Sequence, residues 1–209
     1  MNSSIKELTI PVFPLQVVLF PGGKLPLHIF EERYRLMFAT ILSGDGLFGV
    51  LNLDEDRQMA SVGCLARVAD VTRFDDGRLT IDARGVERFR VKEILQVKPF
   101  ISALVELIDE SEPEEEAYSK ARELREMLGN LFRLSSKLLG KDLEVGEIWP
   151  QSPRELSFMV PASLYGSSSE QQRILEIDDT CTRLEAEKET LEVAIKSLAA
   201  RTALKDALG

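Results

Sequence analysis

Short apolar stretches separated by turn-forming residues fill the first half of the chain, a pattern that predicts β-strands. Four prolines interrupt the mainly apolar segment 11–30 and exclude a helix there. Proline cannot donate a hydrogen bond within a sheet, so residues 8–15, which contain two of these prolines, are expected to form an edge strand. The prolines therefore indicate short, stiff strands that bend around a small, curved sheet or barrel.

Further extended segments are expected at residues 17–20, 25–29, 47–51, 62–74, 78–82, 86–97 and 100–108. Asp75-Asp76-Gly77 has the composition of a hairpin turn, and residues 83–85 are expected to bend the chain again. One helix interrupts these strands, because apolar residues recur every three or four positions from Phe30 to Ile41. This helix is expected to end near Gly44.

An acidic run at residues 109–116 marks the change to a helical second half. We interpret it as a solvated linker whose charge favours the start of the next helix, with an acidic docking tail as the alternative. The residues that indicate helix ends are Gly140, the capping patterns Ser152–Glu155 and Ser167–Glu170, an interruption at Pro161, and a break near Asp178-Asp179 before a long C-terminal helix. The predicted domains are a β-rich lobe over residues 1–110 and a helical lobe over residues 111–209.

Composition and charge limit the classes of partner. The chain has 209 residues, is 44% hydrophobic, and carries a formal net charge of -9, which repels phosphate backbones and anionic lipid surfaces. Basic residues between positions 66 and 93 alternate with acidic ones, so no basic face is predicted. No nucleic-acid or membrane partner is expected. The absence of a signal-peptide pattern or long apolar run predicts a cytoplasmic protein, in which Cys64 and Cys181 are reduced.

Motifs for catalysis or cofactor binding are missing. His28 is the only histidine, and it is expected to be structural because it lies in an apolar strand pattern. One histidine and two distant cysteines cannot form a zinc site, and no phosphate-binding glycine motif occurs. The sequence therefore predicts no metal, no cofactor and no catalytic residue, although a serine–lysine dyad leaves too weak a trace to be excluded.

Four segments, in this order, resemble the N-terminal substrate-binding domain of the ATP-dependent Lon proteases. They are IPVFPLQVVLFPG at 10–22, PLHIFEERY at 26–34, VGCLARV at 62–68 and RGVERFRV at 84–91. Residues 156–164 and 171–184 are similar to the helical part that follows in those enzymes. The resemblance implies an α+β fold. A PUA-like, β-rich barrel or sheet with one packed helix would be followed by a C-terminal helical bundle ending in a long helix.

The resemblance also implies a function. The sequence stops before the ATPase module and the serine–lysine protease module of Lon, so we expect a stand-alone domain that is not an enzyme. It would bind unfolded or damaged polypeptides as an adaptor or holdase in protein quality control, together with a separate protease or ATPase, or it would bind one specific protein partner. Candidate contact residues are apolar residues beside turns or loops: Phe20, Leu27, Phe30 and Trp149.

Three alternatives remain open from the sequence. PUA-like folds include RNA-binding modules, although the acidic balance argues against that function here. A hydrolase with a cryptic serine–lysine dyad is the second alternative. The third concerns assembly: the leucines of the C-terminal helix are expected to form a core stripe, but they could also pair with another chain and produce a homo-oligomer.

Overall fold

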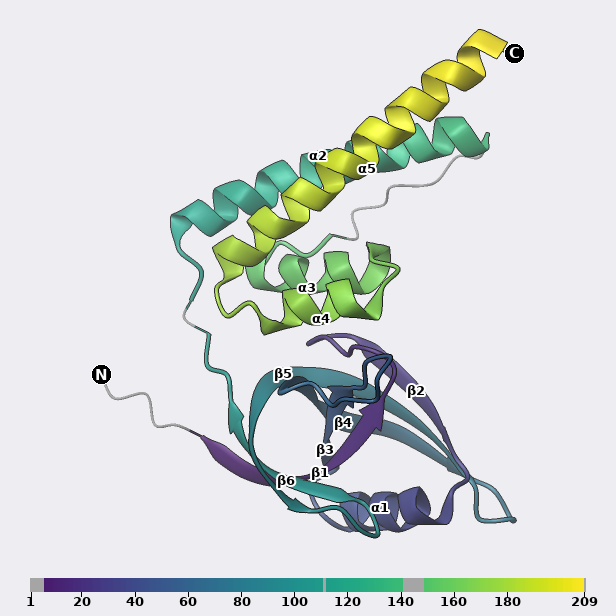
Figure 1. The fold of residues 1–209 in the computed structure, drawn as a ribbon, viewed down its shortest axis with the longest axis vertical. Coiled ribbons are helices and arrows are strands. Elements are labelled where there is room, and N and C mark those ends of the chain that lie inside the picture. Colours follow the sequence, from purple (N-terminus) through teal and green to yellow (C-terminus); the bar gives the residue numbers. More distant parts are fainter. Residues whose placement is uncertain (1–5, 111, 141–148, 209) are drawn as a thin grey trace. The chain divides into compact units, whose positions relative to one another are not determined.

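The computed structural model describes residues 6–110, 112–140 and 149–208, with side chains described up to residue 205 (Figure 1). Six strands come first: β1 (Glu7–Leu15), β2 (Lys24–Ile29), β3 (Leu47–Asn52), β4 (Val62–Arg73), β5 (Leu79–Gln96) and β6 (Ile101–Leu107). The helices are α1 (Glu32–Ser43), α2 (Glu115–Leu139), α3 (Pro153–Leu164), α4 (Ser168–Glu176) and α5 (Thr180–Leu208). The predicted α+β class, with one helix among the strands and a long C-terminal helix, is confirmed.

The chain divides into two compact units. The first contains Met1–Glu110 and Pro161–Glu176, and the second contains Ser111–Val160 and Ile177–Gly209. The boundary after residue 110 coincides with the end of the predicted β-rich lobe, but residues 161–176 belong to the first unit and not to one helical lobe. The next boundary between the units falls between Val160 and Pro161, within α3. The predicted interruption of the helix at Pro161 is wrong, because α3 continues through this residue to Leu164.

The six strands of the first unit form one sheet in the order β2-β5-β4-β3-β1-β6. Because β6 also pairs with β5, the strands β5, β4, β3, β1 and β6 close into a ring, and β2 adds to β5 outside it. Only β1 and β3 pair in parallel, while the other pairs are antiparallel. Figure 1 shows the strong curvature of this sheet.

The prolines of β1 lie where only one neighbouring strand is present. Pro11 is opposite Ser102 of β6, and pairing with β3 begins only at Val12. Pro14 is opposite Leu51 of β3, beyond the last pair with β6. The expected edge strand is therefore wrong for β1 as a whole, because β1 lies between two staggered neighbours. The missing proline N–H groups are tolerated because each proline has an unpaired side.

The sequence predicted two strands, 78–82 and 86–97, where the structure has the single 18-residue strand β5. Its pairing with β4 is shifted at two points, and at the first of them Ala66 is opposite Gly85 while Leu65 is opposite Glu87. This bulge at Val86 bends β5 without interrupting it. Gly85 has no room for a Cβ atom because the carbonyl oxygen of Phe20 lies against it.

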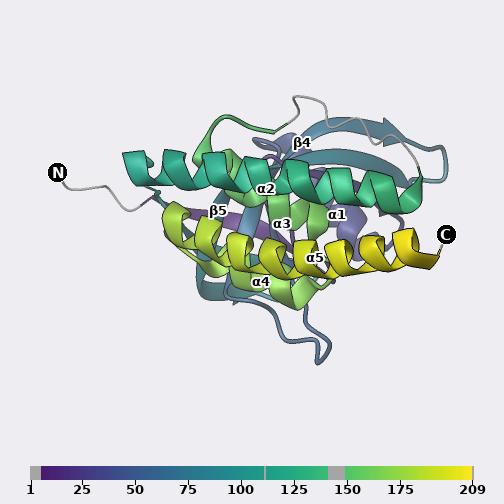
Figure 2. The same ribbon diagram turned by 90° about the horizontal axis from the view of Figure 1, so that it is seen from above.

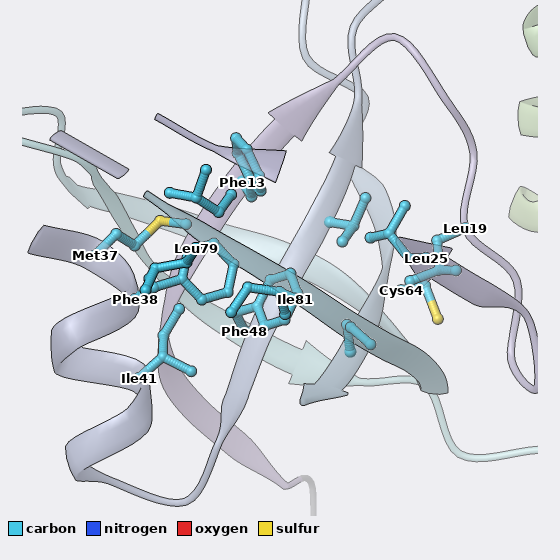
Figure 3. Close-up of a cluster of buried hydrophobic side chains, with 14 residues drawn as sticks. Phe13, Leu19, Leu25, Met37, Phe38, Ile41, Phe48, Cys64, Leu79 and Ile81 are labelled. Atoms are coloured by element: carbon cyan, nitrogen blue, oxygen red, sulfur yellow. The ribbon is translucent and has the colours of Figure 1, made fainter. Parts of the chain in front are cut away.

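Side chains from α1 and the strands form the larger apolar core of the first unit (Figure 3). Met37, Phe38 and Ile41 are the buried residues of α1. The ring of Phe38 meets that of Phe48 edge to face, with 5.2 Å between the ring centroids. This face of α1 packs against the strands, and the residues on its other face are exposed.

A buried arginine joins α4 to the sheet. Arg88 of β5 is fully buried, and its Nη2 lies 2.7 Å from the Glu110 carboxylate. Its Nη1 donates a 2.7 Å hydrogen bond to the carbonyl oxygen of Leu175. The Gln172 side chain also donates to the carbonyl oxygen of Val62, at 3.0 Å. These bonds explain why residues 161–176 belong to the first unit, because they satisfy buried polar groups that the sheet alone leaves unpaired.

In the second unit, α2 and α5 run side by side and parallel (Figure 2). The contacts between them keep a nearly constant sequence offset, because Lys120 pairs with Glu185, Glu123 pairs with Lys188, and Lys205 donates to the carbonyl oxygen of Leu138. The helix ends predicted at Ser152 and Gly140 are confirmed. The backbone N–H of Glu155 donates to the Ser152 hydroxyl at the start of α3, and Gly140 ends α2 in the left-handed conformation.

Two ionisable side chains of α5 are buried one turn apart. Arg183 is fully buried and donates to the Ser157 hydroxyl at 3.0 Å and to the Ile177 carbonyl oxygen at 2.7 Å, with its guanidinium over the Phe158 ring. Glu187 is also fully buried. Burial raises the pKa of the Glu187 carboxyl well above its ordinary value, and the opposing effect of the nearby Arg183 charge is smaller.

We predict that Arg88→Met lowers the free energy of unfolding of the first unit by about 3–5 kcal/mol, because it leaves the Glu110 carboxylate buried without its cation. Urea unfolding and hydrogen exchange of the α4 amides measure this. The double variant Arg88→Met, Glu110→Leu removes both charges and should recover most of the loss. Unchanged protection of α4 in the single variant would contradict the anchoring role of Arg88.

We predict that Glu187→Gln stabilises the second unit at neutral pH and removes a pH dependence. The folded carboxyl has the raised pKa, so the folded state keeps a proton that the unfolded state releases. The contribution of Glu187 to the free energy of unfolding is therefore fully present below the pKa of this carboxyl in the unfolded state. It is lost as the pH rises through the higher pKa of the folded state. Unfolding followed by the fluorescence of Trp149, which lies in this unit, measures the effect. The exposed Glu189→Gln is the matched control, and an equal response of both variants would refute the assignment.

Candidate functional site

Exposed apolar side chains occur on the first unit where β2 ends, α1 begins and β4 turns into β5. Phe30 is 62% exposed, Leu36 is 50% exposed and Phe74 is 44% exposed. The exposed His28 ring lies 6.3 Å from each of the Phe30 and Phe74 ring centroids. We call this region the α1–hairpin surface, defined by His28, Phe30, Glu32, Arg35, Leu36, Ala39, Arg73, Phe74, Gly77 and Leu79.

The alternating pattern of β2 determines which side chains reach this surface. Leu25, Leu27 and Ile29 turn to the core, and the residues between them are exposed. Among the strands that the structure describes, β2 pairs only with β5, so its other edge is open. The backbone of Gly23 points to β5, because Gly85 donates a hydrogen bond to its carbonyl oxygen. Backbone groups point alternately to one side and the other along an antiparallel strand, so the backbone of Pro26, three residues later, points to the open edge. Pro26 has no N–H, so the edge is a poor template for adding a strand.

A hollow of about 270 Å³ lies between α1 and the β4–β5 hairpin. Its lining residues are Glu32, Arg35, Leu36 and Ala39 from α1, with Arg73, Gly77 and Leu79 from the hairpin. Leu36, Ala39 and Leu79 give it apolar walls, and the arginines contribute two cationic groups. The hollow can accept an apolar side chain together with an anionic group.

Gly77 brings the hairpin turn close to Arg35. Its φ of +82° lies in the left-handed region, and a Cβ atom at this position would collide with the Arg35 guanidinium. The turn is closed by hydrogen bonds from Gly77 N–H to the Phe74 carbonyl oxygen at 2.9 Å and from Phe74 N–H to the Arg78 carbonyl oxygen at 3.0 Å. Arg35 therefore lies directly against the backbone of the turn.

The arginines near the hollow differ in their pairing. Two form ion pairs with neighbouring carboxylates: Arg33 with Glu31 at 2.9 Å, and Arg78 with Asp76 at 2.6 Å. The backbone N–H of Arg78, followed by its side chain, holds the pKa of Asp76 below its ordinary value. Within the described part of the chain, Arg35 and Arg73 form no ion pair. The hollow therefore keeps two cations available to a ligand.

The structure brings one of the four sequence-predicted contact residues to this surface. Phe30 lies on it, whereas Leu27 is half-buried against the core of the same unit. Phe20 is only 1% exposed. Trp149 is half-buried in the second unit, with its ring centroid 5.6 Å from that of Phe132.

Sequence reasoning missed Phe74 and Leu36. Phe74 directly precedes the predicted hairpin turn, and that position was the available signal. Leu36 lies off the apolar stripe that was used to predict α1, which is the sign of an exposed helical leucine. His28 is exposed on the outer face of β2, although a structural role was predicted for it.

The described residues contain no cluster of three or more histidine, cysteine or acidic side chains that could hold a metal ion. Burial raises the pKa of the Cys64 thiol to about 12, so it is protonated at neutral pH, and the Cys181 thiol also has a raised pKa because of burial. Both cysteines are free. None of the described helices combines the length and apolar character needed to cross a membrane.

Comparisons with known proteins identify a family. The model for the ATP-dependent protease La (LON) substrate-binding domain matches residues 9–193. The Lon protease of Dictyoglomus thermophilum is 28% identical over 210 residues, covering 90% of this chain and 25% of that protein. The Lon protease of Koribacter versatilis is 30% identical over 196 residues, covering 88% and 24%. The chain thus spans about a quarter of the length of the curated relatives it matches.

Two solved structures share the fold. The Lon N-terminal domain protein from Xanthomonas campestris has a TM-score of 0.63 at 24% identity, covering 86% of this chain and 96% of that chain. The N-terminal domain of the Mycobacterium avium complex Lon protease has a TM-score of 0.68 at 19% identity, covering 88% and 98%. The arrangement of sheet and helices implied by the sequence resemblance is confirmed.

Proposed function

Because the chain belongs to the Lon substrate-binding domain family, which makes it a substrate-recognition module, we propose that it binds polypeptide clients through the α1–hairpin surface. The exposure of Phe30 and Phe74 beside one another through His28, next to a hollow that Leu36 lines, carries this proposal. Exposed apolar groups that lie together favour a binding surface over a solvated face. Phe30 is kept from the sequence prediction, and Phe20, Leu27 and Trp149 are left out because they are wholly or partly buried.

Binding would remove apolar surface from water. An apolar client side chain would enter the hollow against Leu36 and Leu79, while Phe30 and Phe74 would contact a neighbouring part of the client. Each Å² of apolar surface that is buried stabilises the complex by about 25 cal/mol, before the cost of ordering the client. Unfolded or damaged chains expose such side chains and folded proteins bury them, so the surface would distinguish between the two. This step needs neither a nucleotide nor a catalytic residue.

The proposed cellular role is that of an adaptor or holdase in cytoplasmic protein quality control. Similarity to Lon proteases, over about a quarter of their length, supports a link to proteolysis. A separate ATPase or protease would then process the bound client. The helix α5 supplies a candidate self-association surface, because Val193 is 69% exposed and Leu204 is 61% exposed.

RNA binding is the second candidate function, favoured by aromatic and arginine side chains on one surface. Four carboxylates argue against RNA binding. Glu31 and Glu32 lie at the start of α1, and Asp75 and Asp76 lie in the turn between β4 and β5. A phosphate backbone crossing this surface would meet them at short range. Polypeptide binding agrees better with the mixed charges.

We predict that the double variant Phe30→Ser, Phe74→Ser binds a labelled, permanently unfolded polypeptide at least about tenfold more weakly, because two aromatic contacts are lost. Fluorescence anisotropy without nucleotide measures this, with the same label on a stably folded protein as a negative control. Both side chains are exposed, so circular dichroism and the unfolding midpoint should stay unchanged.

Val97→Ser is the matched control, since Val97 is 66% exposed in the same unit but lies on the β5–β6 turn. It should bind the unfolded polypeptide like the wild type. Equal binding by wild type and double variant would move the client site away from the α1–hairpin surface. No binding by the wild type would refute the recognition of unfolded clients in general.

A further inference from the structure

We propose that Arg35 and Arg73 select clients in which a carboxylate side chain lies beside an apolar one. This inference rests on the proposed function and adds the chemical class of the client. Both arginines line the hollow that also presents Leu36 and Leu79, so one short peptide segment could reach both kinds of wall. The two arginines would determine specificity, while the apolar residues would supply most of the affinity.

The unpaired state of the two arginines is the first argument. Arg33 and Arg78 are exposed neighbours that already hold carboxylates of this chain. Arg35 and Arg73 form no ion pair with the described residues, although they face the hollow. A planar guanidinium can bind a carboxylate through two parallel hydrogen bonds, which favours carboxylates over amides of the same shape.

The place of Arg35 is the second argument. Its guanidinium lies against the hairpin turn at Gly77, where a Cβ atom would collide with it. Arg35 of α1 and Arg73 of β4 line the same hollow, so cations from two elements are available to one ligand.

The carboxylates around the hollow restrict the ligand to few charges. Glu32 lines the hollow together with the two arginines, which leaves one net positive charge among the lining residues. Three more carboxylates are close in sequence to lining residues: Glu31 directly precedes Glu32, and Asp75 and Asp76 directly precede Gly77. An isolated aspartate or glutamate can reach the arginines, whereas a polyanion would also meet these carboxylates and the acidic protein as a whole. The site thus fits an acidic–apolar peptide better than a nucleic acid.

The test uses two labelled unstructured peptides with the same apolar core, one with aspartate beside it and one with asparagine at that position. Anisotropy titrations at low and moderate salt compare three proteins: the wild type, the double variant Arg35→Gln, Arg73→Gln, and the matched control, which is the double variant Arg33→Gln, Arg78→Gln. Wild type should bind the aspartate peptide about five- to tenfold more tightly at low salt, and the preference should shrink as salt rises. The first double variant should lose the preference with unchanged affinity for the asparagine peptide, and the control should keep it.

The other outcomes separate the inference from the function it rests on. Equal affinity of wild type for both peptides, with Phe30 and Phe74 still required, would overturn the acidic preference and leave polypeptide binding intact. A preference that persists in Arg35→Gln, Arg73→Gln would assign the selection to other residues and also overturn the inference. No binding of either peptide would refute the proposed function itself. A single-stranded oligonucleotide that binds more tightly than the aspartate peptide would favour nucleic-acid recognition instead.

Discussion

A buried guanidinium requires fixed acceptors, and Arg88 finds them only when three distant parts of the chain meet. It lies on β5, its carboxylate partner Glu110 follows the last strand, and its carbonyl partner Leu175 belongs to α4. Leaving such a charge unpaired costs several kcal/mol, so this ion pair strongly disfavours arrangements in which α4 leaves the sheet. The first unit consequently includes residues 161–176, and the second unit consists of the chain on either side of them, Ser111–Val160 and Ile177–Gly209.

The closed sheet leaves little strand edge open to backbone pairing. Closure of the ring removes most strand edges, and the remaining edge of β2 carries Pro26, which limits backbone pairing. The helix α1 buries Met37 and Phe38 in the core, so Arg35 and Leu36, which directly precede them, lie on the other face and line the hollow beside the hairpin. Recognition at this place would depend on side chains and not on strand addition. That conclusion joins the packing of the fold to the proposed chemistry.

Local signals predicted much of the fold. Turn and capping residues such as Gly44, Gly140 and Ser152 gave helix ends that agree with the structure, because such ends depend on neighbouring residues. Long-range pairing was not readable in the same way. The position of α4 depends on bonds between residues 87 and 110 positions apart, and the bulge that keeps β5 continuous depends on its pairing with β4.

The candidate site shows the same division. Phe30 was selected as an apolar residue beside a turn or loop, but Phe20 met the same criterion and is buried, since exposure depends on tertiary packing. The pairing of Arg33 and Arg78 came from carboxylates two residues away, a local pattern. The availability of Arg35 and Arg73 required the hairpin to be placed against α1, which is a tertiary fact.

Charge acts on this protein at two ranges. The net charge of -9 spreads over the whole chain and disfavours polyanions at a distance, although physiological salt screens it beyond about 8 Å. In the hollow, the two exposed guanidinium groups would act at contact distance, with one carboxylate, that of Glu32, beside them. A client with one carboxylate among apolar residues would carry little charge to be repelled and could reach both the arginines and the apolar walls. Binding of an acidic segment by an acidic protein would therefore depend on the local excess of one positive charge in the lining.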